Sequence, residues 1–386
     1  MVKRGKGKLR TALVNHQARS LQRKAEKQHA EAREAALNRK AKSKNSSAKP
    51  KPKKHVSPFT RDDTILLIGE GNFSFALSLL CEPHCHPPHL LLATSFDTEQ
   101  EVHEKYPDAR DILTEIRKRA GVYADSILAF GVDAGALHKY TPITGGRTAS
   151  PYRWSKVWFG FPHANRAGAG HKDEQRNVLA NQLLLLRFFV SVAPFLTRGP
   201  IPTYAANVKK IRNESDDDDD DDQSDDFHAD NGPKQSLQDI QDLDQYDVQE
   251  AHTKRAFQPP FRQGSVLITL RNTSPYTLWN VPMLAKRLPK VLAPIVASAP
   301  ALPRHMHAPT VQDVERNEAY YTLWRSYEFF PEDWSHYSHR RTVGWIEGVS
   351  TSENQDLLRR TNATAQLGKH SGTGECRTWE VGLRDS

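Results

Sequence analysis

Short apolar runs alternate with longer stretches of helical periodicity along residues 60–200, and the alternation resumes at residue 265. The apolar runs are continuous and rich in branched side chains, as in strands that are buried on both faces of a parallel sheet. We predict strands at residues 64–68, 90–96, 126–130, 156–161 and 265–270, and a last pair at residues 320–330 and 342–345.

The stretches between these runs have the spacing of helices. Pro107 is expected to kink or split the second of them, because proline cannot donate an intrahelical hydrogen bond, and Gly121 is expected to end it. Pro194 should end the third, which is long and apolar. Helices are predicted at residues 73–80, 98–120, 176–192 and 282–286. This order of elements indicates an α/β fold with a seven-stranded, mostly parallel sheet that helices cover on both faces.

Charge divides the chain into segments. The 386 residues carry 54 Lys and Arg against 46 Asp and Glu, but residues 1–55 hold 18 basic and three acidic residues, and residues 214–250 hold 16 acidic residues and one basic residue. Such dense charge comes without the apolar residues for a core, so both segments are predicted to be disordered or conditionally ordered. We expect a basic arm at residues 1–59, a folded domain at 60–346 interrupted by an acidic insert at about 199–263, and a polar tail at 347–386.

The basic arm has two functional interpretations. It can bind RNA through the release of counterions, and Lys51, Lys53 and Lys54 form a cluster typical of a nuclear or nucleolar address. A merely solubilising tail is the alternative. The acidic insert is interpreted as a solvated loop, or as an intramolecular competitor of RNA for the basic arm.

Composition narrows the class of protein. Three cysteines, Cys81, Cys85 and Cys376, exclude a disulfide-stapled secreted scaffold. The longest apolar stretch, residues 183–196, contains Arg187 and is too short for a membrane span, and the first residues lack the apolar core of a signal peptide. We expect a soluble intracellular protein that does not contact a membrane.

Candidate chemistry lies at the carboxyl ends of the strands, where an open α/β sheet binds its ligands. The first strand ends in Gly69, Glu70, Gly71 and Asn72, and glycines there allow a tight turn and a close approach of a ligand to the backbone. Ser74 stands where a dinucleotide fingerprint has its third glycine, so a nucleoside without a pyrophosphate, such as S-adenosylmethionine, fits better. The alternative is a tight turn that binds no ligand.

Acids follow the next two strands. Asp97 can accept both hydroxyls of a ribose, and Asp133, together with the amide of Ala134, can read the edge of an adenine. Either acid alone could instead be a helix N-cap. Three such features at three successive strand ends predict a cofactor site.

Four motifs resemble those of a known family: residues 68–75 (IGEGNFSF), 93–97 (ATSFD), 159–163 (FGFPH) and 337–342 (YSHRRT). In these motifs the chain is similar to the fungal 25S ribosomal RNA uridine-N(3) methyltransferase family, over about residues 60–346 apart from the insert. The resemblance implies a Rossmann-like class I methyltransferase fold, S-adenosylmethionine as the methyl donor and nucleolar ribosomal RNA as the substrate. Gly160 departs from the pattern, because related sequences often carry a polar residue there.

The fourth strand leads into Phe161, Pro162 and His163. Methyltransferases that act on base nitrogens commonly hold a flipped base with a proline-centred turn and an aromatic at this place. The imide of uridine is a poor nucleophile until its proton leaves, and His163 is the candidate base, with a turn-capping histidine as the alternative. Arg340 and Arg341 are candidate RNA ligands, with a structural salt bridge as the alternative.

Residues 81–89 hold two thiols and three imidazoles, which are ligand types for zinc. The segment is a proline-rich connector without an obvious second ligand pair, so we expect no metal site. The leading hypothesis is therefore an S-adenosylmethionine-dependent methyltransferase for a uridine of large-subunit ribosomal RNA, working as a monomer in the nucleus and nucleolus. The alternative is a non-catalytic RNA-binding factor for ribosome assembly on the same fold.

Overall fold

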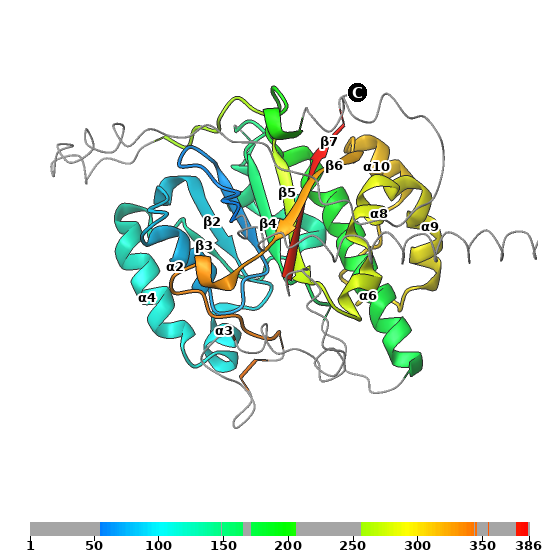
Figure 1. Cartoon of the computed structure of the whole chain (residues 1–386), viewed down its shortest axis with the longest axis horizontal. Coiled ribbons are helices and arrows are strands. Elements are labelled where there is room, and N and C mark those ends of the chain that lie inside the picture. Colours follow the sequence, from blue (N-terminus) through cyan, green and yellow to red (C-terminus); the bar gives the residue numbers. More distant parts are fainter. Residues whose placement is uncertain are drawn as a thin grey trace, which may run out of the picture. The chain divides into compact units, whose positions relative to one another are not determined.

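The computed structural model describes residues 55–147, 149–164, 171–205, 256–342, 344–345, 354 and 376–384 (Figure 1). Residues 1–54 of the predicted basic arm, including Lys51, Lys53 and Lys54, and the acidic run at 214–250 lie outside these residues. His55 already contacts the folded domain, because its Nδ1 lies 2.7 Å from the carboxylate of Asp333.

The described residues contain seven strands: β1 (Ile65–Ile68), β2 (Leu91–Thr94), β3 (Leu128–Ala129), β4 (Lys156–Gly160), β5 (Ser265–Arg271), β6 (Tyr321–Glu328) and β7 (Cys376–Leu383). They form one sheet in the order β3-β2-β1-β4-β5-β7-β6. Strands β1 to β5 pair in parallel, and β7 runs antiparallel to both of its neighbours, β5 and β6. The predicted α/β class and the seven-stranded, mostly parallel sheet are confirmed.

The last strand of the sheet lies later in the chain than predicted. The described residues of 342–345 form no strand, and residues 376–383, predicted as part of a polar tail, form β7 instead. The tail prediction is wrong because β7 is a strand of mixed polarity within a stretch that is polar overall, and its buried charged residue Glu380 is paired inside the protein. The buried carboxylate of Glu380 accepts hydrogen bonds from Lys156 Nζ at 2.5 Å and from Arg325 Nε at 2.6 Å. A carboxylate between two cations tolerates burial that a lone charge would not.

Two groups of helices cover the sheet. One group comprises α2 (Ser74–Leu80), α3 (Glu99–Lys105) and α4 (Ala109–Ala120), and the other comprises α6 (His171–Val192), α8 (Val281–Lys286), α9 (Leu288–Ser298) and α10 (Val311–Arg316); α5 (Thr141–Thr144) is a single turn. The two groups lie on opposite faces of the sheet (Figure 1). The break between α3 and α4 confirms the split predicted at Pro107, and Gly121 follows the end of α4 as predicted.

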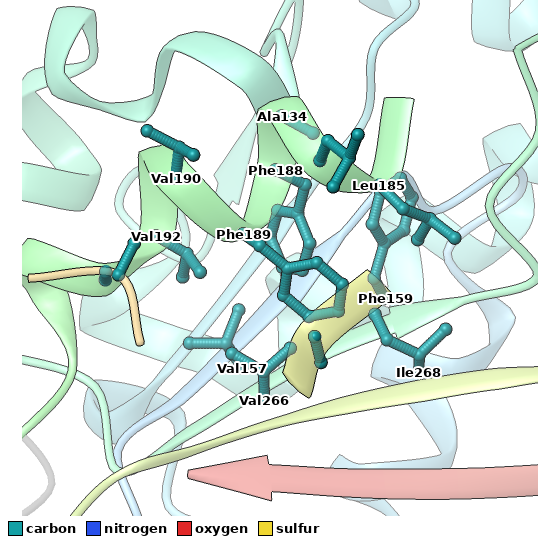
Figure 2. Close-up of a cluster of buried hydrophobic side chains, with 14 of the residues drawn as sticks. Ala134, Val157, Phe159, Leu185, Phe188, Phe189, Val190, Val192, Val266 and Ile268 are labelled. Carbon is teal, nitrogen blue, oxygen red and sulfur yellow. The ribbon is translucent and has the colours of Figure 1, made fainter. Parts of the chain in front are cut away.

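Helix α6 is the core helix of its face. Its apolar side packs on β4 and β5 (Figure 2), where Leu185, Phe188, Phe189 and Val192 meet Val157, Phe159, Val266 and Ile268. The helix begins earlier than predicted, and Glu174–Phe195 is long and apolar enough to cross a membrane, contrary to the length argument made from the sequence. However, 78% of its most apolar window is buried inside the fold, as in a core helix.

The acidic insert is shorter than predicted. Residues 199–205 and 256–263 were assigned to it by the sequence pattern, but both segments pack on the domain. Gln263 N donates to the carbonyl of Pro200 at 2.9 Å, and the ring of Phe257 lies 5.3 Å from that of Trp154. Only residues 206–255 of the predicted insert lie outside the described part of the chain.

Candidate active site

A cavity of about 450 Å³, here called the first cavity, opens at the carboxyl ends of β1 to β4 and is closed on one side by α6. Its volume is within the range of small-molecule sites, about 300–1,000 Å³. It lies where the sequence predicted the cofactor. The predicted site residues among its lining are Gly69, Glu70, Gly71, Asp97, Asp133, Phe161, Pro162 and His163.

The turn after β1 depends on a glycine. Gly69 has a φ of 71°, and a Cβ added there would lie 2.8 Å from the ring of Phe159. Both the left-handed conformation and the lack of space exclude a larger residue without strain. The next residue fixes the turn to the neighbouring strand, because Glu70 N donates to the carbonyl of Thr94 at 2.8 Å.

Glu70 is the most buried acid of the first cavity, with 8% of its surface exposed. Burial raises the pKa of its carboxyl to about 8, although the amides of Phe75 and Ala76 in α2 act in the opposite direction. A carboxyl in this environment is largely protonated at neutral pH until a cation approaches it. Glu70 can therefore respond to the charge of a ligand.

The charged lining of the first cavity is mainly acidic. Four acids and two bases line it: Glu70, Asp97, Glu101, Asp133, Lys105 and Arg187. Both bases are paired with lining acids, since Lys105 Nζ lies 2.5 Å from Asp97 Oδ1 and Arg187 Nη2 lies 2.7 Å from Asp133 Oδ2. Even with Glu70 protonated, three acids face two bases. The lining suits a cationic nucleoside better than a pyrophosphate.

Asp133 is also a helix N-cap. Its Oδ1 accepts a hydrogen bond from Gly135 N at 2.9 Å at the start of a 3-10 helix (Ala134–Lys139), while its Oδ2 is held by Arg187. The side chain of Arg187 is 4% exposed and donates from Nε to the carbonyl of His307 at 3.0 Å. The N-cap alternative left open by the sequence therefore describes the Asp133 carboxylate in this structure.

A second cavity of about 480 Å³ adjoins the first. The two share a wall, made by Gly69, Glu70, Gly71, Tyr106, Phe161, His163 and Thr342. Phe161 turns the chain at this wall with a φ of 49°, an uncommon conformation for an aromatic residue, and its N–H donates to the carbonyl of Thr269 at 2.8 Å. The Phe161-Pro162-His163 turn thus stands between two adjacent pockets.

The strap, defined as residues 337–342, folds over the turn after β1. Ser338 N donates to Ser74 Oγ at 3.0 Å, and Ser74 Oγ donates back to the carbonyl of Ser338 at 2.9 Å. Tyr106 also binds the strap, because its hydroxyl donates to the carbonyl of Arg341 at 3.1 Å. These bonds make the strap a wall of the second cavity.

Two predicted residues have structural partners here. Arg340 Nη2 lies 2.6 Å from Asp108 Oδ2, and its side chain is 7% exposed, so the salt-bridge alternative holds for Arg340. Asn72 Nδ2 donates to the same Asp108 oxygen at 2.9 Å, and Asn72 lines the second cavity rather than the predicted cofactor site. Arg341 is exposed and lines the second cavity as well.

Sequence reasoning missed several lining residues. Arg187 had a signal, because it is a charge in the middle of the most apolar helix, and such a residue is buried only with a partner. Lys105 and Tyr106 had no such signal in the sequence, since their contacts with Asp97 and with the strap depend on how α3 ends.

The connector at residues 81–89 holds His84, whose ring stacks on Trp334 at 4.5 Å. No group of three or more potential metal ligands gathers among the residues that the structure describes.

Comparison with known proteins identifies the family of the chain. The family described as rRNA (uridine-N3-)-methyltransferase BTM5-like matches residues 66–341. The chain is 25% identical over 308 residues to the 25S rRNA (uridine(2634)-N(3))-methyltransferase of Saccharomyces cerevisiae, covering 74% of this chain and 80% of that protein.

Two further relatives match a shorter part of the chain. The ferredoxin-fold anticodon-binding domain-containing protein 1 homolog of Mus musculus is 34% identical over 134 residues, which is 35% of this chain and 18% of that protein. The heavy metal-associated isoprenylated plant protein 41 of Arabidopsis thaliana is 32% identical over 134 residues, 35% of this chain and 23% of that protein. The family match itself spans well over half of the chain, and with the sheet and the paired cavities it shows that this chain belongs to the rRNA (uridine-N3-)-methyltransferase family.

Proposed function

We propose that the protein transfers a methyl group from S-adenosylmethionine to N3 of a uridine in large-subunit (25S-type) ribosomal RNA. The observation that carries the proposal is the pair of cavities with a common wall at Gly69–Gly71 and Phe161–His163. A methyl donor and a methyl acceptor need separate pockets that meet at the reacting atoms. Family membership supplies the reaction class.

The first cavity fits the cofactor by its charge and its donors and acceptors. S-adenosylmethionine carries a sulfonium and an ammonium and no phosphate, which matches a lining with more acids than bases. Gly69 and Gly71 let the backbone approach the methionine part, and the Asp97 carboxylate accepts the ribose hydroxyls. Asp133 lines the end of the cavity assigned to the adenine, where its carboxylate orders the backbone at Ala134. When bound, the cofactor supplies a methyl group whose bond to sulfur breaks, with both electrons staying on sulfur, as the new bond to N3 forms.

His163 is proposed to take the imide proton of the uracil. It lines both cavities and is exposed in the ligand-free protein, and partial desolvation by the surrounding protein lowers the pKa of its imidazole, so the ring is unprotonated and able to accept a proton at neutral pH. The N–H bond breaks toward the imidazole, and the electron pair that it leaves on N3 forms the new bond to carbon. Phe161 and Pro162 hold the base in place for this transfer.

RNA binding outside the pocket is assigned to cationic residues. Arg341 lies at the surface beside the second cavity. Lys51, Lys53 and Lys54 add a basic cluster in the arm that suits phosphates and a nucleolar location. We propose a monomer that works on ribosomal RNA or pre-ribosomal particles in the nucleus and nucleolus.

The direct test is methyl transfer by the purified full-length protein. An unmodified transcript of large-subunit ribosomal RNA is incubated with the protein and S-adenosylmethionine, and its nucleosides are analysed by mass spectrometry. We expect 3-methyluridine at one site, and none when uridine at that site is replaced by cytidine. A protein that binds both the cofactor and the RNA but forms no 3-methyluridine would instead be a non-catalytic assembly factor.

A further inference from the structure

The floor of the second cavity is the backbone at Gly160, backed by a buried indole. Gly160 lines this cavity, and a Cβ added at Gly160 would overlap the six-membered ring of Trp158. The indole therefore lies over a residue that has no side chain of its own. This accounts for glycine at the one position in the fourth-strand motif where similar sequences often carry a polar residue.

The floor is held in one orientation. Trp158 Nε1 donates to Thr269 Oγ1 at 2.8 Å, and the indole stacks on Phe75 with ring centroids 3.9 Å apart and an interplanar angle of 22°. The indole itself is only 3% exposed, so it offers no face to a ligand and instead supports the backbone at Gly160, which lines the cavity. A floor that is fixed in this way before a ligand binds loses little conformational entropy on binding.

The edge of the cavity offers a neutral hydrogen-bonding group. Burial and the nearby Arg271, Arg340 and Arg341 lower the pKa of His339 to about 3, so its imidazole is uncharged. One ring nitrogen, Nδ1, lies 3.3 Å from the hydroxyl of Tyr337, and the ring packs edge-on against Phe161 at 4.5 Å. A neutral imidazole with one nitrogen engaged presents the other to the carbonyl or imide of an uncharged heterocycle.

Positive charge lies beside this neutral edge. Arg271 at the end of β5 and Arg341 in the strap both line the second cavity. Guanidinium groups next to an aromatic pocket are the arrangement in which a flipped nucleotide keeps its phosphate at the surface while its base enters the protein. A free amino acid or a lipid would not use both the flat, neutral pocket and the guanidinium groups beside it.

We infer that the second cavity binds the acceptor nucleotide, with a uracil base against the Gly160 backbone, His339 at the base edge and the phosphate toward Arg271 and Arg341. The inference rests on the proposed function and makes it more specific. It assigns base recognition to residues outside the Phe161-Pro162-His163 turn. Because each cavity also has lining residues that the other lacks, each can be filled by a substitution of its own.

The test uses one filling substitution in each cavity of the full-length protein. Gly160→Val pushes the indole into the second cavity, whereas Ala180→Leu fills the first cavity from α6. We expect Gly160→Val to raise KM for the ribosomal RNA transcript about 10-fold or more, which corresponds to a loss of about 1.4 kcal/mol. The Kd for S-adenosylmethionine should stay unchanged, because Gly160 lines the second cavity and not the first. Ala180→Leu should weaken cofactor binding. Unchanged RNA kinetics in folded Gly160→Val would overturn the inference.

A second measurement does not need turnover. A transcript carrying 4-thiouridine at the methylated position is crosslinked to the wild-type protein by light, and the attached peptides are identified by mass spectrometry. Crosslinks at Tyr276 or His339, which both line the second cavity, are expected, and His339→Ala should reduce their yield without changing cofactor binding. Crosslinks confined to α6 or to the segment after α9, which line the first cavity, would overturn the assignment. If the protein forms crosslinks in the second cavity but no 3-methyluridine, the proposed function fails while this nucleotide site stands.

Discussion

Lys105 Nζ lies 2.5 Å from Asp97 Oδ1, so the carboxylate assigned to the ribose is already paired with a cation. Lys105 is the last residue of α3, and its carbonyl accepts a hydrogen bond from Trp345 N at 2.7 Å. The ion pair thus connects the strand end that carries Asp97 to the chain just beyond the strap. A ligand that binds Asp97 meets an oriented carboxylate with one oxygen committed to Lys105.

Replacing Asp97 should weaken cofactor binding strongly. Asp97→Ala leaves the ribose hydroxyls without an acceptor in a closed pocket, at a cost of about 1–3 kcal/mol, which is roughly 5- to 150-fold in the Kd for S-adenosylmethionine. Calorimetry measures this directly. Lys105→Met is the matched control, because it removes the ion pair and keeps the acceptor. Equal losses in the two variants would mean that the ion pair, and not the ribose contact, explains the effect.

The basic arm should act on RNA and not on the cofactor. Residues 55–386 form a compact unit that is separate from residues 1–54, so a chain that starts at His55 is the suitable truncation. This truncation removes all 18 basic residues of the arm, the last of which is Lys54. RNA affinity should therefore fall, and its dependence on salt concentration should become weaker. The Kd for S-adenosylmethionine should not change. An unaltered salt slope would leave the arm with a targeting role alone.

The strands could be predicted wherever a buried strand coincides with a continuous apolar run in the sequence. Leu66 and Leu67 in β1 have no polar neighbours in their strand, and the period of the pattern is sufficient there. Strand β7 could not be predicted, because Glu380 is stabilised by Lys156, which is 224 residues away in the chain. An ion pair between residues so far apart cannot be recognised from the sequence around either residue. A strand of mixed polarity within a polar stretch was therefore mistaken for part of a tail.

The site was predictable in position and less so in detail. Strand ends converge in any open α/β sheet, and this places Gly69, Asp97 and His163 around one cavity without further information. The partners of each side chain depend on tertiary packing. Arg340 is an example, because its partner Asp108 comes from the start of α4. The sequence of a basic motif does not show whether its arginine contacts RNA or a carboxylate.

The buried Lys156–Glu380 pair should be essential for stability. Burial opposes the charge on Glu380, but Lys156 and Arg325 outweigh it and hold the pKa of the carboxyl well below its usual range. Glu380→Gln leaves two cations without their counter-charge and should lower the free energy of unfolding at about pH 7 by roughly 3–5 kcal/mol. The exposed pair of Arg198 and Glu318 is the comparison, since Glu318→Gln should cost at most about 1 kcal/mol.

The pH dependence of this effect has a definite sign. Because the folded pKa of Glu380 lies below the unfolded value of about 4.3, its contribution is complete above that value and is lost as the pH falls below it. Urea unfolding should therefore show a constant difference between wild type and Glu380→Gln from about pH 7 to pH 5, and a difference that shrinks from about pH 5 to pH 3. A constant difference over that interval would show that Glu380 acts through packing rather than charge.

Glu70 should have the opposite pH dependence. Its folded pKa of about 8 lies above the unfolded value, so the wild type loses stability as the pH rises from the unfolded pKa through 8. Glu70→Gln removes this loss. By thermal melting without cofactor, the variant should exceed the wild type by about 5 °C or more at pH 9, and the two should nearly coincide at pH 5. Glu104→Gln, at an exposed position of α3, should give the same difference at both pH values.

The last prediction concerns proton transfer by His163. Partial desolvation lowers the pKa of this histidine, so the wild-type rate should rise with pH only up to that lowered pKa and then stay level through neutral pH. His163→Ala must wait for the uracil imide to ionise by itself. Its turnover at neutral pH should be about 10- to 1000-fold lower, with an unchanged Kd for S-adenosylmethionine.

The two pH profiles distinguish a base from a structural histidine. The rate of His163→Ala should keep rising with pH, because the imidate fraction grows tenfold for each pH unit, and it should approach the wild-type rate where the imide ionises unaided. His163→Gln, which keeps a hydrogen-bonding side chain but cannot take up a proton near neutral pH, should follow the alanine variant. If His163→Gln instead matched the wild type, His163 would only cap the turn, and the rate would come from positioning by Phe161 and Pro162 and from the positive charge of the donor.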